Sequence, residues 1–421
     1  MNPLASPQTR RAVRAWSCRS QQRALAAAAR AWLWRTLPAL TRPLFAWPPI
    51  APGATSAAAV YEPAVRSSTP VSAVLREHHG RDRFRNPWPS VGPSLTPGVL
   101  FKSVIKGEWA RPGPAVVPTE PPAFLAPATA DPPPDKLRAT WLGQACFYLE
   151  MPSGLRVLTD PQLSERCAPP LLPSPPRVTP LPCTAADLPG VDVVVISHSH
   201  YDHLDVNSIA ALVERFPGVH FLVPLGLERW FAQFGVTSVT ELDWWDEREV
   251  SVGGRTGLFS CLPAQHETKR GLFDNNTTLW SSWSIDSGVR VYFSGDTGYS
   301  YVPPAPPGVD DHDMSAPVCP AFAEIGEHRG PFDLALIGIG AYQPRGRLSG
   351  VHCDPLDAVR LFRDVRARRG LAMHWGTWTL SAEPTLEPPR KLQDALVQFG
   401  MPPTGVFDVV PVGASREYAP V

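Results

Sequence analysis

Four titratable residues lie within a few positions of one apolar run: His198, His200, Asp202 and His203 come just after residues 193–196. Zinc in proteins is bound by histidine nitrogens and carboxylate oxygens at about 2.0–2.2 Å, and a catalytic zinc keeps one coordination position open. Because residues i and i+2 of an extended segment point the same way, the first two histidines can share one metal ion. Asp202 and His203 lie past the turn and are better placed for a second ion.

Three later residues complete the set of candidate ligands. His266, Asp296 and His374 each lie at or near the end of an apolar segment of strand length. Loops at one edge of a layered sheet are where a rigid scaffold presents its functional residues. Taken singly, each has an ordinary explanation, since a histidine can be a packing residue and Asp296 can be a turn aspartate. Their order along the chain, together with the first cluster, predicts a site for two metal ions.

Three further residues are candidates around this site. His352 stands between a Gly/Tyr/Pro/Arg loop and a predicted helix, so it could donate a hydrogen bond to a phosphate oxygen or a leaving group, or simply be a helix-start histidine. Asp160 follows an apolar strand and is expected to orient a ligand histidine. We predict Asp202 and His352 as catalytic residues, and Tyr201 and His352 as substrate contacts. The remaining histidines are interpreted as surface or packing residues: His78, His79, His220, His312 and His328.

The elements that must position these residues follow from the alternation of apolar runs with helical patterns. The predicted strands are 146–151, 155–158, 191–196, 219–223, 289–293, 334–339 and 371–373. The predicted helices are 208–214, 227–234, 355–368 and 391–399. Strands mixed with helices in this way favour an α/β layered domain.

The residues before this domain have a different composition. Residues 1–61 contain eight arginines and no acidic residue, which is typical of an organelle transit peptide, with a disordered Ala/Arg tail as the alternative. Residues 112–134 hold nine prolines and are expected to form an extended linker or wrapping arm. We therefore divide the chain into an extension (1–65), a proline-rich arm that packs on the core (66–136) and a catalytic domain (137–421).

Composition excludes several classes of function. The 421-residue chain has a net charge of zero and carries no basic stripe in its compact part, so a nucleic acid is not expected as a partner. Its seven cysteines are dispersed, which favours free thiols in a reducing, intracellular compartment over a disulfide framework. No run approaches the ~20 apolar residues that a membrane-spanning helix requires.

The order of the candidate ligands resembles that of the metallo-β-lactamase superfamily. This resemblance implies a four-layer αβ/βα sandwich with a dinuclear zinc site at its edge, and hence two Zn²⁺ per chain. By the same resemblance, one zinc is bound by His198, His200 and His266, and the second by Asp202, His203 and His374, with Asp296 bridging both.

A closer resemblance, over about residues 78–415, is to the N-acyl-phosphatidylethanolamine-hydrolysing phospholipase D family. The tracts that carry it are FRNPWP (84–89), WLG (141–143), LTDP (158–161), VPLGL (223–227), ELDWW (241–245), GDTGY (295–299), GAY (340–342), HCDP (352–355) and HWGT (374–377). Three features depart from the family pattern: Gln144 stands where a histidine is expected, Glu267 where an aromatic residue is familiar, and residues 302–319 resemble an insertion. We expect none of them to touch the predicted ligands.

The resemblance implies a zinc-dependent phosphodiesterase that hydrolyses N-acyl-phosphatidylethanolamine to N-acylethanolamine and phosphatidic acid, through attack of a metal-bound hydroxide at phosphorus. The alternatives are another hydrolase of the same fold, such as a lactonase or a different phosphodiesterase, and a non-catalytic lipid-binding scaffold. A phospholipid substrate places the protein at a membrane surface as a peripheral protein, and the arginine-rich N-terminus points to a mitochondrion or another organelle. Loops 168–182 and 101–109 are proposed as lipid contacts, and the family implies a homodimer.

Overall fold

The computed structural model describes residues 77–93, 113, 115–125, 135–168, 174–303 and 316–420. The predicted extension 1–65 and the proposed lipid-contact segment 101–109 lie outside these residues, as do 169–173 of the other proposed lipid loop. Within the described part of the chain, no helix combines the length and the apolar character needed to cross a membrane.

The first of two sheets has seven strands in the order β14-β1-β2-β3-β4-β5-β6. Its strands are β1 (Leu137–Gly143), β2 (Cys146–Glu150), β3 (Arg156–Thr159), β4 (Val193–Val195), β5 (His220–Pro224), β6 (Val239–Leu242) and β14 (Ser415–Tyr418). Strands β14 to β3 pair antiparallel, whereas β3 to β6 pair parallel. Every residue of β2 to β5 is buried, because strands covered on both faces read as continuous apolar runs.

The second sheet also has seven strands, in the order β13-β12-β11-β10-β9-β8-β7. Its strands are β7 (Glu247–Val252), β8 (Arg255–Leu262), β9 (Ser282–Asp286), β10 (Arg290–Phe293), β11 (Leu334–Gly338), β12 (Gly370–Met373) and β13 (Phe407–Asp408). Strands β7 to β10 pair antiparallel and β10 to β13 pair parallel. Each sheet is therefore mixed, with one parallel half.

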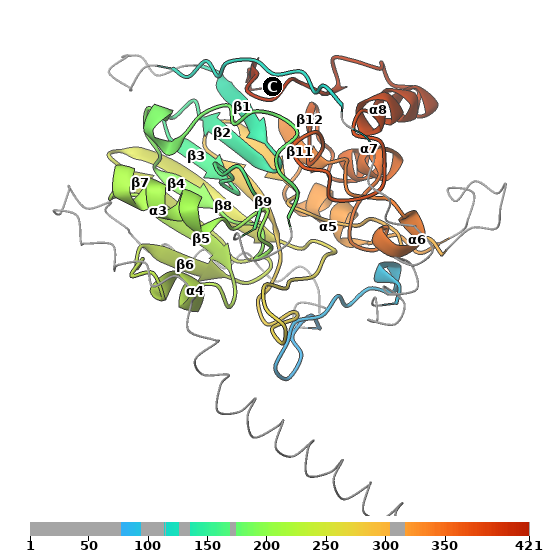
Figure 1. The fold of residues 1–421 in the computed structure, drawn as a ribbon, viewed down its shortest axis with the longest axis horizontal. Helices are drawn as coiled ribbons and strands as arrows, with labels where there is room; N and C mark the ends of the chain where they lie inside the picture. Colours follow the sequence, from blue (N-terminus) through green and yellow to red (C-terminus); the bar gives the residue numbers. More distant parts are fainter. Residues whose placement is uncertain are drawn as a thin grey trace, which may run out of the picture. The chain divides into compact units, whose positions relative to one another are not determined.

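Helices cover the outer faces of the two sheets (Figure 1). They are α3 (Val206–Arg215), α4 (Glu228–Ala232), α5 (Ala321–His328), α6 (Arg345–Leu348), α7 (Pro355–Asp364) and α8 (Glu387–Gln398). In Figure 1, α3 and α4 lie on the side of the first sheet, and α5, α7 and α8 on the side of the second, where α7 contacts β11, α5 and α8. The order helices, sheet, sheet, helices confirms the predicted four-layer α/β sandwich.

The space between the sheets holds the main hydrophobic core. Trp141, Phe147 and Val195 of the first sheet belong to one buried cluster with Phe259 and Trp283 of the second. Burying a large apolar side chain of this kind contributes about 1.5–3 kcal/mol. This core fixes the position of the loops at the sheet edge, because the last three residues of each strand that leads to a ligand are buried.

Side-chain caps fix the starts of the two helices nearest the ligand segments. Asp205 accepts hydrogen bonds from the backbone N–H groups of Asn207 and Ser208 at the start of α3, and Asp354 accepts one from Asp357 at the start of α7. Such caps satisfy backbone donors that have no partner inside the helix. The helix α3 therefore begins directly after Asp205, and Asp202 and His203 lie in the turn that precedes it.

The described parts of the proline-rich arm contact the catalytic domain. Thr119 pairs with Val412, and Val117 is buried in the core. Farther upstream, the side-chain amide of Asn86 donates to the backbone oxygen of His266 over 2.8 Å. The arm thus reaches one of the predicted metal ligands directly.

Candidate metal centre

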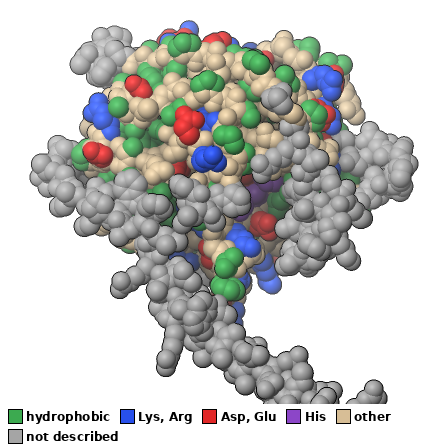
Figure 2. Space-filling model, in the orientation of Figure 1, with side chains coloured by type: hydrophobic (Ala, Val, Ile, Leu, Met, Phe, Trp, Pro, Cys, Tyr) green, Lys and Arg blue, Asp and Glu red, His purple; other side chains and the backbone are tan. Residues whose placement is uncertain are grey.

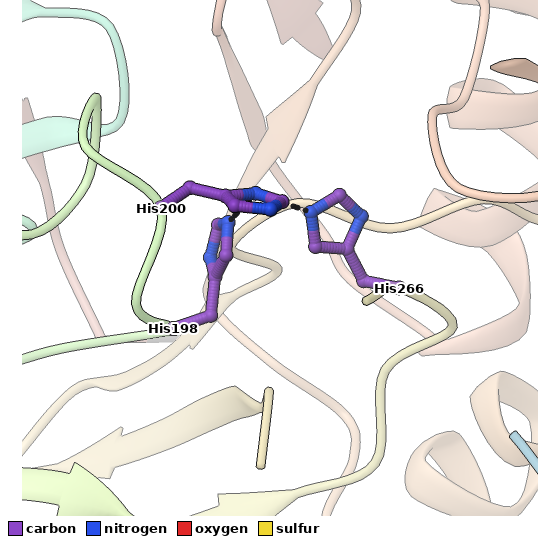
Figure 3. A group of neighbouring side chains, drawn as sticks. All are labelled: His198, His200 and His266. Carbon is purple, nitrogen blue, oxygen red and sulfur yellow. Dashed lines mark hydrogen bonds between the residues drawn. The ribbon is translucent and has the colours of Figure 1, made fainter. Parts of the chain in front are cut away.

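The first group of predicted ligands converges at the edge of the sandwich. His198 and His200 follow β4, and His266 follows β8. The Nε2 atom of His198 lies 2.9 Å from Nδ1 of His200, which lies 3.2 Å from Nε2 of His266. Figure 3 shows the three rings turned toward one another. Donors held about 2.0–2.1 Å from one tetrahedral ion lie about 3.3–3.4 Å apart, so the spacing of these nitrogens fits a single metal ion.

The second group of predicted ligands, Asp202, His203 and His374, lies beside the first and also brings its donor atoms close together. The Nε2 atoms of His203 and His374 are 3.3 Å apart. Asp202 Oδ2 lies 3.3 Å from the first of these nitrogens and 3.4 Å from the second. The three donor atoms thus form a second set with the spacing of ligands to one ion.

Asp296 lies between the two groups. Its Oδ1 is 3.1 Å from Nε2 of His374, and its Oδ2 is 3.1 Å from Nε2 of His203. The same Oδ2 is 3.8 Å from His266 Nε2 and 3.9 Å from His198 Nε2. This single carboxylate therefore faces both histidine sets. The structure brings together all seven residues that the sequence predicted as ligands.

Hydrogen bonds behind the histidines orient their rings. Asp160 Oδ2 accepts from Nδ1 of His203 over 2.7 Å and from the Ser197 hydroxyl over 2.5 Å. Because that hydroxyl proton is used, the Nδ1–H of His198 donates to Ser197 Oγ over 2.9 Å. His266 Nδ1 donates to the backbone oxygen of Val351 over 2.8 Å. Each bond leaves an Nε2 lone pair directed into the site, the usual arrangement behind metal-bound histidines, and the contact of Asp160 is the one predicted for it.

The backbone around the site adopts the left-handed conformation at several points. His374 has φ +63° and Gly295, directly before Asp296, has φ +54°. A Cβ atom at Gly295 would lie 2.5 Å from the Cβ of Ser197, so the Ser-Gly-Asp tract requires glycine there. Unfavourable backbone conformations of non-glycine residues such as His374 concentrate at functional sites, where the surrounding packing holds them.

The protonation states of most of these groups suit a metal. Burial lowers the pKa of His200 to about 4 and that of His266 to about 3, and places the pKa of His198 well below its ordinary value. Burial would raise the pKa of Asp202 and Asp296, but His203 more than offsets this, so both carboxyl pKa values lie well below the ordinary one. Neutral imidazoles and ionised carboxylates are the forms that bind metal ions.

The pKa values of His203 and His374 are shifted in the opposite direction, because the effect of burial is outweighed by the adjacent carboxylates. The pKa of His203 lies well above its ordinary value, and that of His374 is raised to about 9. Both nitrogens would have to release a proton on binding a metal ion, as metal binding generally requires of its ligands. The donor set of five histidines and two carboxylates matches the chemistry of zinc and similar divalent ions.

Gln144 is a site residue that sequence reasoning missed, and the expectation that it would not touch the ligands is wrong. It lies in the tight turn between β1 and β2 with φ +50°, and its Nε2 donates to Asp202 Oδ2 over 2.7 Å. Its backbone oxygen accepts from the N–H of His374 over 2.9 Å, and its own N–H donates to Thr377 Oγ1 over 2.6 Å. The only signal in the sequence was its departure from the family tract. Of the other two departures, Glu267 is half-buried beside His266, and residues 304–315 of the insertion lie outside the described residues.

The two predicted substrate contacts lie in different places. His352 borders the ligands, with Nδ1 3.9 Å from Asp296 Oδ2 and its ring centroid 5.1 Å from that of His266. It also precedes Asp354, the cap of α7, by two residues. His352 is therefore both a residue at the start of a helix and a neighbour of the predicted ligands. Tyr201 instead donates its hydroxyl to the backbone oxygen of Arg270 over 3.0 Å, and the guanidinium of Arg270 lies 4.1 Å from its ring centre.

A separate cluster joins the arm to the loop after β6. His78 Nε2 and His79 Nε2 each lie 2.7 Å from a different oxygen of Asp243, and the His78 ring stacks on Trp244 with centroids 4.2 Å apart. At this distance the contacts are direct hydrogen bonds, so these histidines anchor the arm, in keeping with their interpretation as packing residues.

Residues 155–375 match the family model described as the Beta-lactamase superfamily domain. With its two mixed sheets and its buried His/Asp clusters, the chain belongs to the metallo-β-lactamase superfamily and has the fold and site of a metal-dependent hydrolase. The chain is 39% identical over 267 residues to N-acyl-phosphatidylethanolamine-hydrolyzing phospholipase D 1 of Caenorhabditis elegans, a match covering 62% of this chain and 70% of the worm protein.

Two further relatives extend this similarity. An uncharacterized protein of Mycobacterium tuberculosis is 40% identical over 265 residues, which cover 61% of this chain and 63% of that protein. The mitochondrial N-acyl-phosphatidylethanolamine-hydrolyzing phospholipase D of Saccharomyces cerevisiae is 34% identical over 267 residues, covering 62% of this chain and 52% of the yeast protein. Among solved structures, the metallo hydrolase Igni18 of Ignicoccus hospitalis is similar with a TM-score of 0.46 and 18% identity, over 67% of this chain and 98% of that one.

Proposed function

We propose that this protein is a phospholipase D-type phosphodiesterase that hydrolyses N-acyl-phosphatidylethanolamine at a membrane surface. The observation that carries the proposal is the position of Asp296 between the two ligand groups. Its Oδ2 lies 3.1 Å from Nε2 of His203 in the second group, and 3.8 and 3.9 Å from Nε2 of His266 and His198 in the first. A carboxylate shared in this way is what a two-metal site needs, and two-metal sites are common in enzymes that cleave phosphate esters. The worm and yeast relatives, both named for this activity, support the choice of substrate.

Two zinc ions would be held by the groups described above, one by His198, His200 and His266 and the other by Asp202, His203 and His374, with Asp296 shared. When bound, such ions lower the pKa of a water molecule and neutralise charge on phosphoryl oxygens. The reaction adds the oxygen of water to phosphorus and breaks the bond from phosphorus to the ethanolamine oxygen. That oxygen leaves with a proton as N-acylethanolamine, and phosphatidic acid remains.

The chain's own residues define where the substrate phosphate can lie. Burial lowers the pKa of His352 to about 3, so its imidazole is neutral at physiological pH and carries one N–H. A neutral imidazole donates a hydrogen bond but is a weak source of protons. We therefore assign His352 to hold a phosphoryl oxygen next to Asp296, and the proton for the leaving oxygen comes from water. Gln144 and Asp160 keep Asp202 and His203 in place for the same reaction.

The test is to incubate the metal-loaded protein with N-acyl-phosphatidylethanolamine and to identify the products by mass spectrometry. The proposal predicts N-acylethanolamine and phosphatidic acid in equal amounts, with the oxygen of labelled water in phosphatidic acid, since water is added at phosphorus and the bond from phosphorus to the ethanolamine oxygen is the one broken. Release of N-acylethanolamine phosphate, or of free fatty acid only, contradicts it. Turnover of lactones in place of the phospholipid would assign the site to a lactonase of the same fold.

A further inference from the structure

Two large apolar side chains stand exposed at the tip of the loop that begins at the ligand His266. Leu272 is 83% exposed and Phe273 is 75% exposed, and no other large apolar residues that are adjacent in sequence are exposed to this degree in the described ranges. The loop, residues 267–278, connects β8 to β9 (Figure 1). Isolated exposed apolar residues are ordinary, but a neighbouring pair beside a functional site indicates an interaction surface.

The loop is fixed from within, so the exposure of its tip is built into the fold. The Asp274 carboxylate accepts hydrogen bonds from the backbone N–H groups of Arg270 and Gly271. Asn276 closes the base of the loop, with its N–H donating to Thr268 O and its side-chain oxygen accepting from Thr268 N, over 2.8 and 2.9 Å. A loop that is already ordered loses little conformational entropy when its tip binds.

Arg270 connects the loop to the metal motif. Its guanidinium donates to the backbone oxygens of Ser199 and Leu204, both over 2.8 Å. It also lies over the rings of Tyr201 and Trp230, at 4.1 and 5.2 Å from their centres. Because Ser199 and Tyr201 alternate with the ligands His198, His200 and Asp202, the tip holds a set position relative to the metal centre.

A basic collar, defined as Arg81, Arg83, Arg85 and Lys269, accompanies the tip; all four residues are exposed. Arg83 donates through Nη2 to the backbone oxygen of Phe273 over 2.8 Å, and Phe84 N donates to Asn276 O over 2.7 Å, so the 77–85 segment lies against the loop. In Figure 2, hydrophobic side chains and Lys or Arg side chains occur together, with some Asp or Glu side chains, on the lower part of the visible face.

The acidic residues of the same two segments only partly offset the collar. Asp274 is engaged by backbone N–H groups, and Glu267 is half-buried, with a pKa raised by burial. The exposed acids are Glu77 and Asp82. Apolar side chains surrounded by an excess of exposed cations match the interface of a bilayer that carries anionic headgroups, where each nearby cation contributes about 1 kcal/mol.

We propose that the Leu272–Phe273 tip inserts into a phospholipid bilayer while the basic collar binds its anionic headgroups. This proposal rests on the proposed function, because a metal centre that cleaves a phospholipid must be brought to the lipid surface. Binding to vesicles of lipids that the enzyme does not hydrolyse tests it independently, because this measurement gives the same answer whether or not the proposed reaction occurs.

The experiment measures the partition of the full chain onto vesicles by flotation, for phosphatidylcholine alone and for phosphatidylcholine mixed with phosphatidylglycerol. The L272S/F273S variant is expected to lose at least tenfold in partition on both, since each side chain contributes more than that when fully transferred from water. The R81Q/K269Q variant should lose binding on the anionic vesicles only, and added salt should have the same effect. Val397 is 59% exposed on α8, so V397S is the matched control and should bind as the original chain does.

Circular dichroism and thermal unfolding should not change in L272S/F273S or in R81Q/K269Q. The single variants L272S and F273S separate the contributions of the two apolar side chains to vesicle binding. Equal partition of L272S/F273S and the original chain overturns the proposal, as does an original chain that binds neither kind of vesicle. If L272S/F273S instead changes the oligomeric state in sedimentation while vesicle binding is retained, the tip is an interface between protein chains and the lipid proposal fails.

Discussion

Gln144 offers the sharpest test of how the chain supports its metal centre. Its side-chain amide donates one hydrogen bond, 2.7 Å long, to the Asp202 oxygen that also faces His203 and His374. A hydrogen bond to a charged group contributes about 1.5–3 kcal/mol, which corresponds to a factor of roughly 10 to 150 in an equilibrium constant. Partners that orient metal ligands typically change metal affinity or activity by about 10- to 100-fold when removed.

The perturbation is Gln144→Asn, with Gln144→His as the matched control. Asparagine tolerates the left-handed backbone found at this position, but its side chain is one methylene too short to reach Asp202. Histidine also tolerates that backbone and can extend an N–H toward the same oxygen. We expect Q144N to weaken binding of the second metal ion by about 10- to 100-fold, and Q144H to stay within a few-fold of the original chain.

The assay is a titration of the metal-free protein with zinc, followed by calorimetry, with turnover measured at saturating zinc as a second readout. A positioning role predicts that the weaker of the two zinc affinities falls in Q144N and that excess zinc restores part of the turnover. Q144N within twofold of the original chain in both measurements would refute the reasoning.

Three further predictions follow from single contacts. H352A should lower turnover about 100-fold while zinc content stays unchanged, because His352 binds substrate and is not a ligand in this account; loss of zinc would contradict that role. R345A should lower the free energy of unfolding by about 3–5 kcal/mol in urea titrations, since it removes the buried cation that pairs with the buried carboxylates of Asp354 and Asp357, whereas the exposed Arg416→Ala should change it little. Burial raises the pKa of Glu150 from 4.5 to about 7, so its contribution to stability is present below pH 4.5 and is lost as pH rises through about 7. E150Q should remove that loss, up to about 3 kcal/mol, and equal pH profiles of the two proteins would contradict it.

The ligands of the metal centre were predictable because local geometry determines them. His198 and His200 follow a fully buried strand in alternation, and Asp296 and His374 follow strands of the second sheet whose apolar runs are continuous. Such runs are visible in the sequence because both faces of each strand are covered. The order in which these residues occur then corresponds to the order in which the chain returns to one edge of the sandwich.

The residues that escaped prediction depend on contacts between distant segments. Gln144 meets Asp202 and His374 only because the turn after β1 packs against the end of β12, and nothing local to residue 144 signals this. The strands β6, β7 and β14 were also missed, because their residues are mostly half-buried or exposed and form no apolar run. The strands β1 and β9 were missed although they are almost fully buried, because polar residues interrupt their apolar runs. The exposed tip of the 267–278 loop is likewise invisible in the sequence, where leucine and phenylalanine normally indicate a core.

The most direct test of the account is the zinc content of the original chain and of D296N, measured by mass spectrometry of the intact protein under native conditions. Asp296 lies 3.1 Å from the second ligand group and 3.8–3.9 Å from the first, and asparagine keeps its size while removing the charge that two metal ions would share. The account predicts about two zinc ions on the original chain, and for D296N a loss of zinc and of turnover with unchanged circular dichroism. A single zinc ion on the original chain, or a D296N protein that keeps both ions and its turnover, would contradict it.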